Sequence, residues 1–124
     1  VFVEDCGYTS TWEIFANELK LRFNLPEFPL MQTASLIASN KAGYDFKEAS
    51  SLTAVSKCDR PMLFIHGTAD DFIPYSMMNE LYEAKPGTNK EMLTAKGATH
   101  ANSLYLLGES YWDTVFDFIN KYIK

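Results

Sequence analysis

The sequence predicts an α/β protein with a parallel sheet flanked by helices. The first observation behind this is an unbroken apolar run from Met62 to Ile65, which His66 and Gly67 bring to an end. Such a run is typical of a strand covered on both faces, as in a parallel sheet. The second observation is that short apolar runs alternate with longer stretches of helical periodicity along the chain. Strands that alternate with helices in this way form parallel sheets.

The composition is that of one modest domain. The chain has 124 residues, of which 47% are hydrophobic and 15% aromatic, and this is enough to form a core. The formal net charge is -5 without any cluster of Lys and Arg, so we expect no nucleic acid as a partner. Because no apolar run approaches a membrane span, we also expect no membrane contact in this segment. A cytoplasmic location is expected unless an export signal or anchor precedes Val1.

The first half of the chain is predicted to be a strand end followed by a helical excursion over residues 10–58. The chain starts at Val1 within what reads as the end of a strand, so we expect a missing upstream part. Ser10 to Glu13 fit a capping box, and a second helix follows the Pro26 and Pro29 breaks. The apolar stripe of the first helix, interpreted as core or lid packing, consists of Trp12, Phe15, Ala16, Leu19 and Phe23. The excursion is longer than an ordinary crossover, and insertions of this kind often cover an active site.

The second half, residues 59–124, is predicted to form strand, helix, strand and helix. After the central strand we expect a helix over 75–85, a strand over 90–96 and a helix over 110–123. A loop of small residues before the last helix carries His100. The last helix should pack one face on the sheet through Trp112, Val115, Phe116, Ile119 and Ile123.

The sequence shows no metal-ligand spacing and no Gly-rich phosphate loop, so we expect no metal and no cofactor. Cys6 and Cys58 lie far apart, and they are either reduced core residues, which we favour, or a bridge. His66, at the end of the buried strand, is interpreted as a hydrogen-bonded core group.

Two segments resemble the acid and histidine segments of the α/β-hydrolase fold family. They are Pro61-Met-Leu-Phe-Ile-His-Gly-Thr-Ala-Asp70-Asp-Phe-Ile-Pro74 and Gly97-Ala-Thr-His100-Ala, in the family order of acid before histidine. The opening Val3-Glu-Asp-Cys-Gly-Tyr8-Thr-Ser also resembles the strand end before the lid in bacterial members of the serine-esterase or peptidase-like type. The resemblance implies that residues 1–124 are the C-terminal part of one α/β-hydrolase domain, with residues 10–58 as a helical lid insertion.

The resemblance places the acid at Asp70 and the base at His100. An imidazole with a pKa near 6.5 accepts a hydroxyl proton and returns it at neutral pH, and a carboxylate on its other nitrogen fixes the tautomer. We favour Asp70 over Asp71, which we interpret as an exposed or helix-capping carboxylate. The alternative for His100 is a loop histidine that only hydrogen-bonds locally. Candidates for lining a substrate pocket are Trp12, Phe15, Phe28 and Met31.

The sequence contains no G-x-S-x-G nucleophile elbow, so the chain alone should not hydrolyse esters by the family mechanism. The first hypothesis is a C-terminal fragment of a serine hydrolase that acts on a small carboxylic ester or related acyl substrate. The alternative is a non-catalytic module that keeps half of the fold for binding or assembly. Because three strands leave a sheet edge without a partner, we expect self-association or pairing with the missing N-terminal half.

Overall fold

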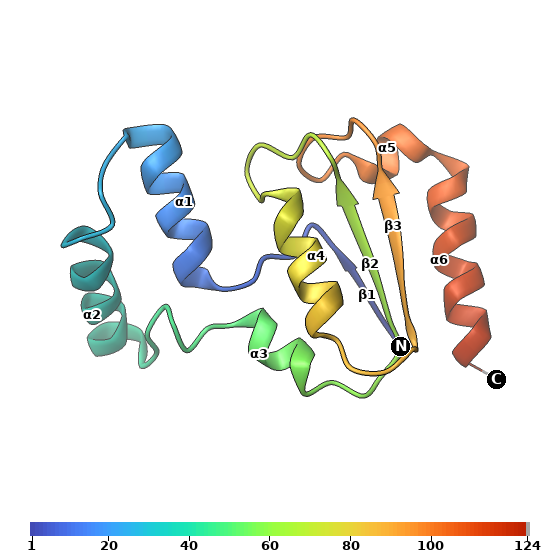
Figure 1. Cartoon of the computed structure of the whole chain (residues 1–124), viewed down its shortest axis with the longest axis horizontal. Coiled ribbons are helices and arrows are strands. Elements are labelled where there is room, and N and C mark those ends of the chain that lie inside the picture. The colour runs from blue at the N-terminus through green and yellow to red at the C-terminus, as the bar shows by residue number, and fades with distance from the viewer. Residues whose placement is uncertain (124) are drawn as a thin grey trace.

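The computed structural model describes residues 1–123 and shows one parallel sheet in the order β1-β2-β3 with helices on both faces (Figure 1). The strands are β1 (Phe2–Asp5), β2 (Met62–Gly67) and β3 (Lys90–Ala95). The helices are α1 (Thr11–Phe23), α2 (Leu30–Ala42), α3 (Ser51–Ser56), α4 (Tyr75–Ala84), α5 (Ser103–Leu107) and α6 (Glu109–Tyr122). The predicted fold class, a parallel sheet flanked by helices, is confirmed.

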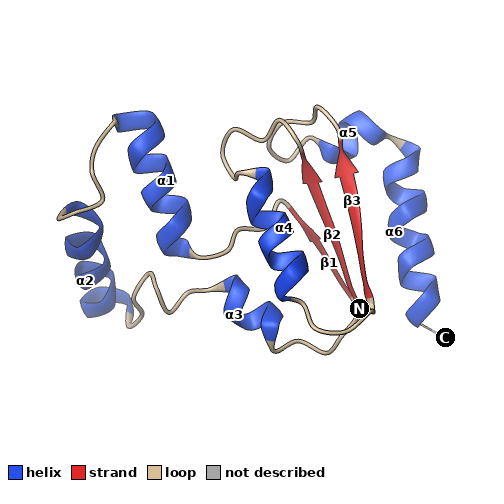
Figure 2. Ribbon diagram, in the orientation of Figure 1, coloured by secondary structure: helices blue, strands red, loops and turns tan. Residues whose placement is uncertain are grey.

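The central strand β2 holds the core together. It pairs in parallel with β1 on one side and with β3 on the other, and all six of its residues are buried. One face of the sheet packs on α3 and α4 through Val55, Met62, Phe64, Met78 and Leu81. The other face packs on α6 through Leu63, Ile65, Tyr111, Val115 and Phe118, and Figure 2 shows α4 and α6 on opposite sides of the strands. Each large apolar side chain buried in this way contributes about 1.5–3 kcal/mol.

The predicted contact face of α6 is partly wrong. Trp112 and Phe116 stack on each other at the surface, where they are 47% and 55% exposed, while Tyr111 and Phe118 point into the core. The helix carries two neighbouring apolar stripes, and spacings of three and four residues fit both of them. The predicted loop that carries His100 is followed by a short helix, α5, which begins at Ser103 and was not predicted.

The predicted helical excursion contains α1, α2 and α3. Ser10 caps α1, since its hydroxyl accepts a hydrogen bond from the Glu13 amide at 3.2 Å, and Gly43 ends α2 with φ of +79°. The apolar stripe of α1 is buried only in part, because Phe15 and Phe23 are 46% and 66% exposed. The core contact of α1 is made instead by Ile14, which packs on Ile73.

A narrow connection joins the α1–α2 pair to the rest of the molecule. Figure 1 shows both helices to one side of the sheet. The chain leaves the body at Thr9 and returns near Ser50, and the two passages are hydrogen-bonded to each other: Leu52 N donates to Thr9 O at 3.0 Å, and Thr11 N donates to Ala49 O at 2.9 Å. The helix pair therefore has a defined base and a large free surface.

Two further expectations concern the membrane and the thiols. Within residues 1–123, no helix has both the length and the apolar character that crossing a membrane would require. Cys6 and Cys58 are both free thiols, Cys6 buried and Cys58 partly so. This agrees with the favoured interpretation of the two cysteines and removes the bridge between them.

Candidate active site

The turn after β2 and the turn after β3 are bound tightly to each other. Ala69 N donates to Ala98 O at 3.0 Å, and Gly97 N donates to the Thr68 hydroxyl at 2.8 Å. Gly67 permits this approach, because a Cβ at that position would lie only 2.2 Å from Ala98 O. The side chains that follow the two strands are therefore forced into the same small volume at the carboxyl edge of the sheet.

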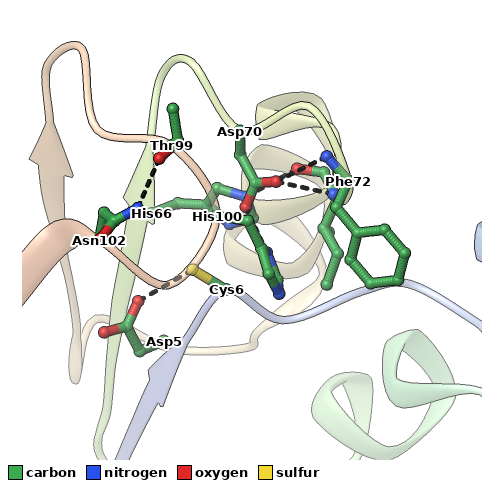
Figure 3. Close-up of polar contacts among 9 residues, drawn as sticks. Asp5, Cys6, His66, Asp70, Phe72, Thr99, His100 and Asn102 are labelled. Carbon is green, nitrogen blue, oxygen red and sulfur yellow. Dashed lines mark hydrogen bonds and ion pairs between the residues drawn. The ribbon is translucent and has the colours of Figure 1, made fainter.

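Asp70 is the centre of this volume, and its side chain is completely buried. One carboxylate oxygen, Oδ1, accepts hydrogen bonds from the amides of Phe72 at 2.9 Å and Ile73 at 2.8 Å. The other oxygen, Oδ2, lies 2.9 Å from Nδ1 of His100, as Figure 3 shows in close-up. The two residues that the sequence proposed as acid and base are thus in contact across thirty positions of the chain.

A second imidazole reaches the same carboxylate. His66 has no exposed side-chain surface, and its Nε2 lies 3.2 Å from Asp70 Oδ2 and 3.0 Å from the carbonyl oxygen of Ile73. Both of these are acceptors, so Nε2 carries the proton. Nδ1 of His66 is then an acceptor, and it has no hydrogen-bond partner among the residues described. The expectation of a hydrogen-bonded core group therefore holds for one ring nitrogen of His66 and not for the other.

The environment of Asp70 keeps it ionised. Burial by itself would raise the pKa of its carboxyl group, but hydrogen bonds from His100 and from the Ile73 and Phe72 amides outweigh that effect and hold the pKa below its usual value. An ionised carboxylate can only accept hydrogen bonds, so Nδ1 of His100 carries the hydrogen and donates it to Asp70. Nε2 of His100 is then the basic nitrogen, on a side chain that is 36% exposed.

The imidazole of His100 is also held from the side. The ring of Phe72 meets it edge to face, with the ring centroids 5.0 Å apart. The guanidinium of Arg22, at the end of α1, lies 5.7 Å from the centroid of the Phe72 ring, and Glu18 forms an ion pair with Arg22. The end of α1 is therefore close to the acid and the histidine, although it belongs to the excursion.

Cys6 is a third chemical group at this edge, and sequence reasoning did not select it. It directly follows β1, with φ of +60°, and its thiol donates to Asp5 Oδ1 at 3.2 Å, while Tyr111 donates to the other Asp5 oxygen at 2.9 Å. Burial raises the pKa of the Cys6 thiol to about 12; the Ala101 amide opposes this rise and Asp5 adds to it. A signal was present, because Cys6 follows a parallel strand just as Asp70 and His100 do.

The four candidate pocket residues lie outside this group. Trp12 lines a cavity of about 520 Å³ between α1 and the start of α4, together with Pro74 and Met77. Phe15 and Met31 line an apolar hollow of about 380 Å³ between α1 and α2. Phe28 is 73% exposed. Asp71, the other candidate for the acid, is exposed. Of the two aspartates, Asp70 is the one that contacts His100.

The chain is similar to known proteins in sequence and in structure. No protein-family profile matches the chain. The uncharacterized protein YqkD of Bacillus subtilis is 34% identical over 119 residues, which are 96% of this chain and 39% of YqkD. The esterase Pf2001 of Pyrococcus furiosus superposes with a TM-score of 0.65 at 21% identity over 98% of this chain and 44% of the esterase.

A second solved structure also superposes on nearly the whole chain. The putative non-heme bromoperoxidase BpoC of Mycobacterium tuberculosis superposes with a TM-score of 0.59 at 16% identity, over 98% of this chain and 58% of BpoC. Both solved structures have the α/β-hydrolase fold. The chain has part of that fold. It spans about two fifths of YqkD and about half of the two solved structures.

Proposed function

We propose that this chain is the C-terminal part of an α/β-hydrolase domain and that it supplies the acid and the base of a serine hydrolase. The observation that carries the proposal is the contact between Asp70 Oδ2 and His100 Nδ1 at 2.9 Å, with Nε2 left as a base on a partly exposed ring. A nucleophile elbow is missing from the sequence, and the matched proteins are longer than the chain. We therefore assign the nucleophilic serine to an upstream part of a longer protein.

The chemistry assigned to the two residues is acyl transfer to water, as in other serine hydrolases. His100 Nε2 removes the hydroxyl proton as the serine oxygen attacks the carbonyl carbon of a carboxylic ester or related acyl compound. The bond to the leaving group then breaks, and the imidazolium returns the proton to it. Water then attacks the acyl-enzyme in the same way. His100 takes a proton from the water, the bond to the serine oxygen breaks, and the proton returns to that oxygen. The buried Asp70 stabilises the imidazolium, and no cofactor is needed in either half-reaction.

The helical excursion, residues 10–58, is proposed to be the lid of this site. Ile14 on α1 is buried against Ile73 and Met77, which follow the acid in the chain. The cavity of about 520 Å³ lies between the same two parts of the molecule and is lined in part by Trp12. We expect a small substrate to enter here, because Trp12, one of the four candidate pocket residues, lines this cavity.

The free edge of β1 is proposed to pair with a strand of the upstream part. β1 is the first strand of the three-stranded order, so one side of it has no partner strand within the described residues. Phe2 and Val3 on this strand are 52% and 37% exposed. In the 124-residue chain alone, pairing between copies is the expected substitute, so sedimentation should show dimers or larger species. A monomer at all concentrations would contradict this part of the proposal.

The test of the whole proposal uses a longer form of the protein that contains these residues and their upstream part. A fluorophosphonate probe should label one serine, and His100→Ala should abolish the labelling, because the serine loses its base. Asp71→Asn is the matched control and should label like the unchanged protein, since Asp71 is exposed. Equal labelling with and without His100 would overturn the proposal. Absence of both labelling and ester hydrolysis in the longer form would favour the non-catalytic module instead.

A further inference from the structure

Three groups with metal-binding chemistry meet at the carboxyl edge of the sheet. Cys6 follows β1, Asp70 follows β2 and His100 lies in the turn after β3, so each comes from a different neighbouring strand. The Cys6 sulfur, a carboxylate oxygen of Asp70 and a ring nitrogen of His100 all lie within 4.8 Å of one another. Figure 3 shows Cys6, Asp70 and His100 at this edge of the sheet, with the Cys6 thiol hydrogen-bonded to Asp5.

This set of atoms matches the preferences of one class of ion. Thiolate sulfur, imidazole nitrogen and carboxylate oxygen are the ligands that Zn²⁺ takes in proteins, at bond lengths of about 2.0–2.3 Å. In a tetrahedral site those bond lengths put the ligand atoms about 3.3–3.7 Å apart. Asp70 Oδ2 and His100 Nδ1 are 2.9 Å apart, and the three ligand atoms lie within 4.8 Å of one another, so small side-chain movements bring them to these separations.

The surroundings also suit a metal site. The Asp70 carboxylate is oriented by the amides of Phe72 and Ile73 and by the buried imidazole of His66. In transition-metal sites, the ligating carboxylates are commonly oriented by such hydrogen bonds. The His100 side chain is 36% exposed, so this ligand is in contact with solvent. Zinc sites with three protein ligands take a water or another ligand in the fourth position.

We propose that Cys6, Asp70 and His100 bind a divalent cation of the zinc class and that the bound ion switches off His100 as a base. His100 stops acting as a base whichever of its two ring nitrogens binds the ion. If Nε2 binds the ion, its lone pair is no longer free to accept a hydroxyl proton. If Nδ1 binds the ion, the ring proton moves to Nε2, and the result is the same. On binding, the thiol releases its proton to solvent, so no oxidant or reductant takes part.

The binding half of this inference does not depend on the proposed hydrolase activity, so it is tested on the 124-residue chain itself. Co²⁺ in place of Zn²⁺ should give a thiolate-to-metal charge-transfer absorption, displaced by one equivalent of Zn²⁺. The absorption should disappear in Cys6→Ser and persist in Cys58→Ser, the matched control at the other free thiol. Calorimetry with Zn²⁺ should show at least about tenfold weaker binding for His100→Gln, because even the partners of metal ligands change affinity by 10–100-fold.

A second measurement guards against a variant that fails to fold. In the unchanged chain, Zn²⁺ should slow the alkylation of Cys6 by a maleimide and leave Cys58 unaffected, as read by mass spectrometry. Absence of a charge-transfer absorption in the unchanged chain would overturn the inference. It would also be overturned by an absorption that survives in Cys6→Ser, by Zn²⁺ binding that is unchanged in His100→Gln, or by equal protection of both thiols.

The inhibitory half rests on the proposed function and is tested separately. In the longer form of the protein, Zn²⁺ should slow fluorophosphonate labelling, and a chelator should restore the rate. Failure to label even without Zn²⁺ would count against the proposed function and not against the metal site. Binding at Cys6 with no change in the labelling rate would overturn the inhibitory half.

Discussion

The turns that carry Asp70 and His100 and the helix pair α1–α2 are built in opposite ways. The two turns are short, are hydrogen-bonded to each other and surround a carboxylate with no exposed surface. The helix pair exposes large apolar side chains, among them Phe23 at 66%, Phe28 at 73% and Leu36 at 64%. The turns are therefore held in place by contacts within the described residues. The helices leave a large apolar surface that those contacts do not cover.

This difference bears on function as well as on stability. A site that moves protons needs fixed donors and acceptors, and the turns provide them through backbone amides that cannot rotate away. The proposed lid needs freedom to open. The helix pair is attached through a hydrogen-bonded base near Thr9 and Ser50 and through the packing of Ile14 on Ile73.

The largest effect is expected at the buried carboxylate. In the longer form of the protein, Asp70→Asn should lower the turnover number for an ester by about 10⁴-fold, because an amide donor in place of the carboxylate favours the wrong tautomer of His100. Asp71→Asn, one residue further along, should change it less than about twofold, since that side chain is exposed. Steady-state kinetics on a soluble ester measure both. Similar losses in the two variants would mean that the acid has been misassigned.

The next largest effect is expected in the core that supports the turns. Phe64→Ala should lower the free energy of unfolding by about 3–5 kcal/mol, since Phe64 is fully buried between the sheet and α4. Urea unfolding followed by circular dichroism measures this loss. The matched change in the helix pair is Phe28→Ala, where the side chain is 73% exposed and a loss below about 0.5 kcal/mol is expected. Equal losses of unfolding free energy in the two variants would show that the helix pair is packed as tightly as the sheet core.

A pH dependence is expected from Glu4, on the free edge of the sheet. Burial raises the pKa of Glu4 from its usual 4.5 to about 7; the Gly7 amide opposes the rise and Asp5 adds to it. The folded state then holds its proton more tightly than the unfolded state. This contribution to stability is present below pH 4.5 and is lost as pH rises to about 7.

Glu4→Gln removes this titration. Its free energy of unfolding should match that of the unchanged chain near pH 4 and should exceed it by about 2–3 kcal/mol near pH 8. Urea unfolding at a series of pH values measures the difference. A gap between the two proteins that stays constant with pH would show that the carboxyl group titrates normally in the folded state.

A smaller effect is expected where the two turns touch. Gly67→Ala should cost about 1–3 kcal/mol, because its Cβ would meet Ala98 O at 2.2 Å and push the turns apart. It should also loosen the hydrogen bond between His100 and Asp70, which the ¹⁵N shifts of the His100 ring report. Gly43→Ala at the end of α2 is the control. It has open space around it and a φ of +79°, so it should cost about 1 kcal/mol and leave the His100 signals unchanged.

Local signals in the sequence were sufficient for most of the secondary structure. The apolar run of β2, the hydroxyl of Ser10 before α1 and the glycine after α2 each act within a few residues of the chain. The paired strand ends also followed from the sequence, since parallel order alone brings residues 70 and 100 to one edge. The exposed apolar residues of α1 and α6 did not follow, because periodicity shows that a stripe exists but not which of two neighbouring stripes finds a partner.

Periodicity, turn residues and strand order were enough to predict the fold class and most of the element order. The choice of Asp70 and His100 as acid and base came from the resemblance to the α/β-hydrolase fold family and stays a prediction. Two features came only from the folded chain: His66 shares the carboxylate of Asp70, and the Cys6 thiol lies within 4.8 Å of His100. These depend on side-chain directions at the ends of three strands far apart in the chain. Spacing along the sequence carries no information about such directions, since they are set by the packing of one turn against the next.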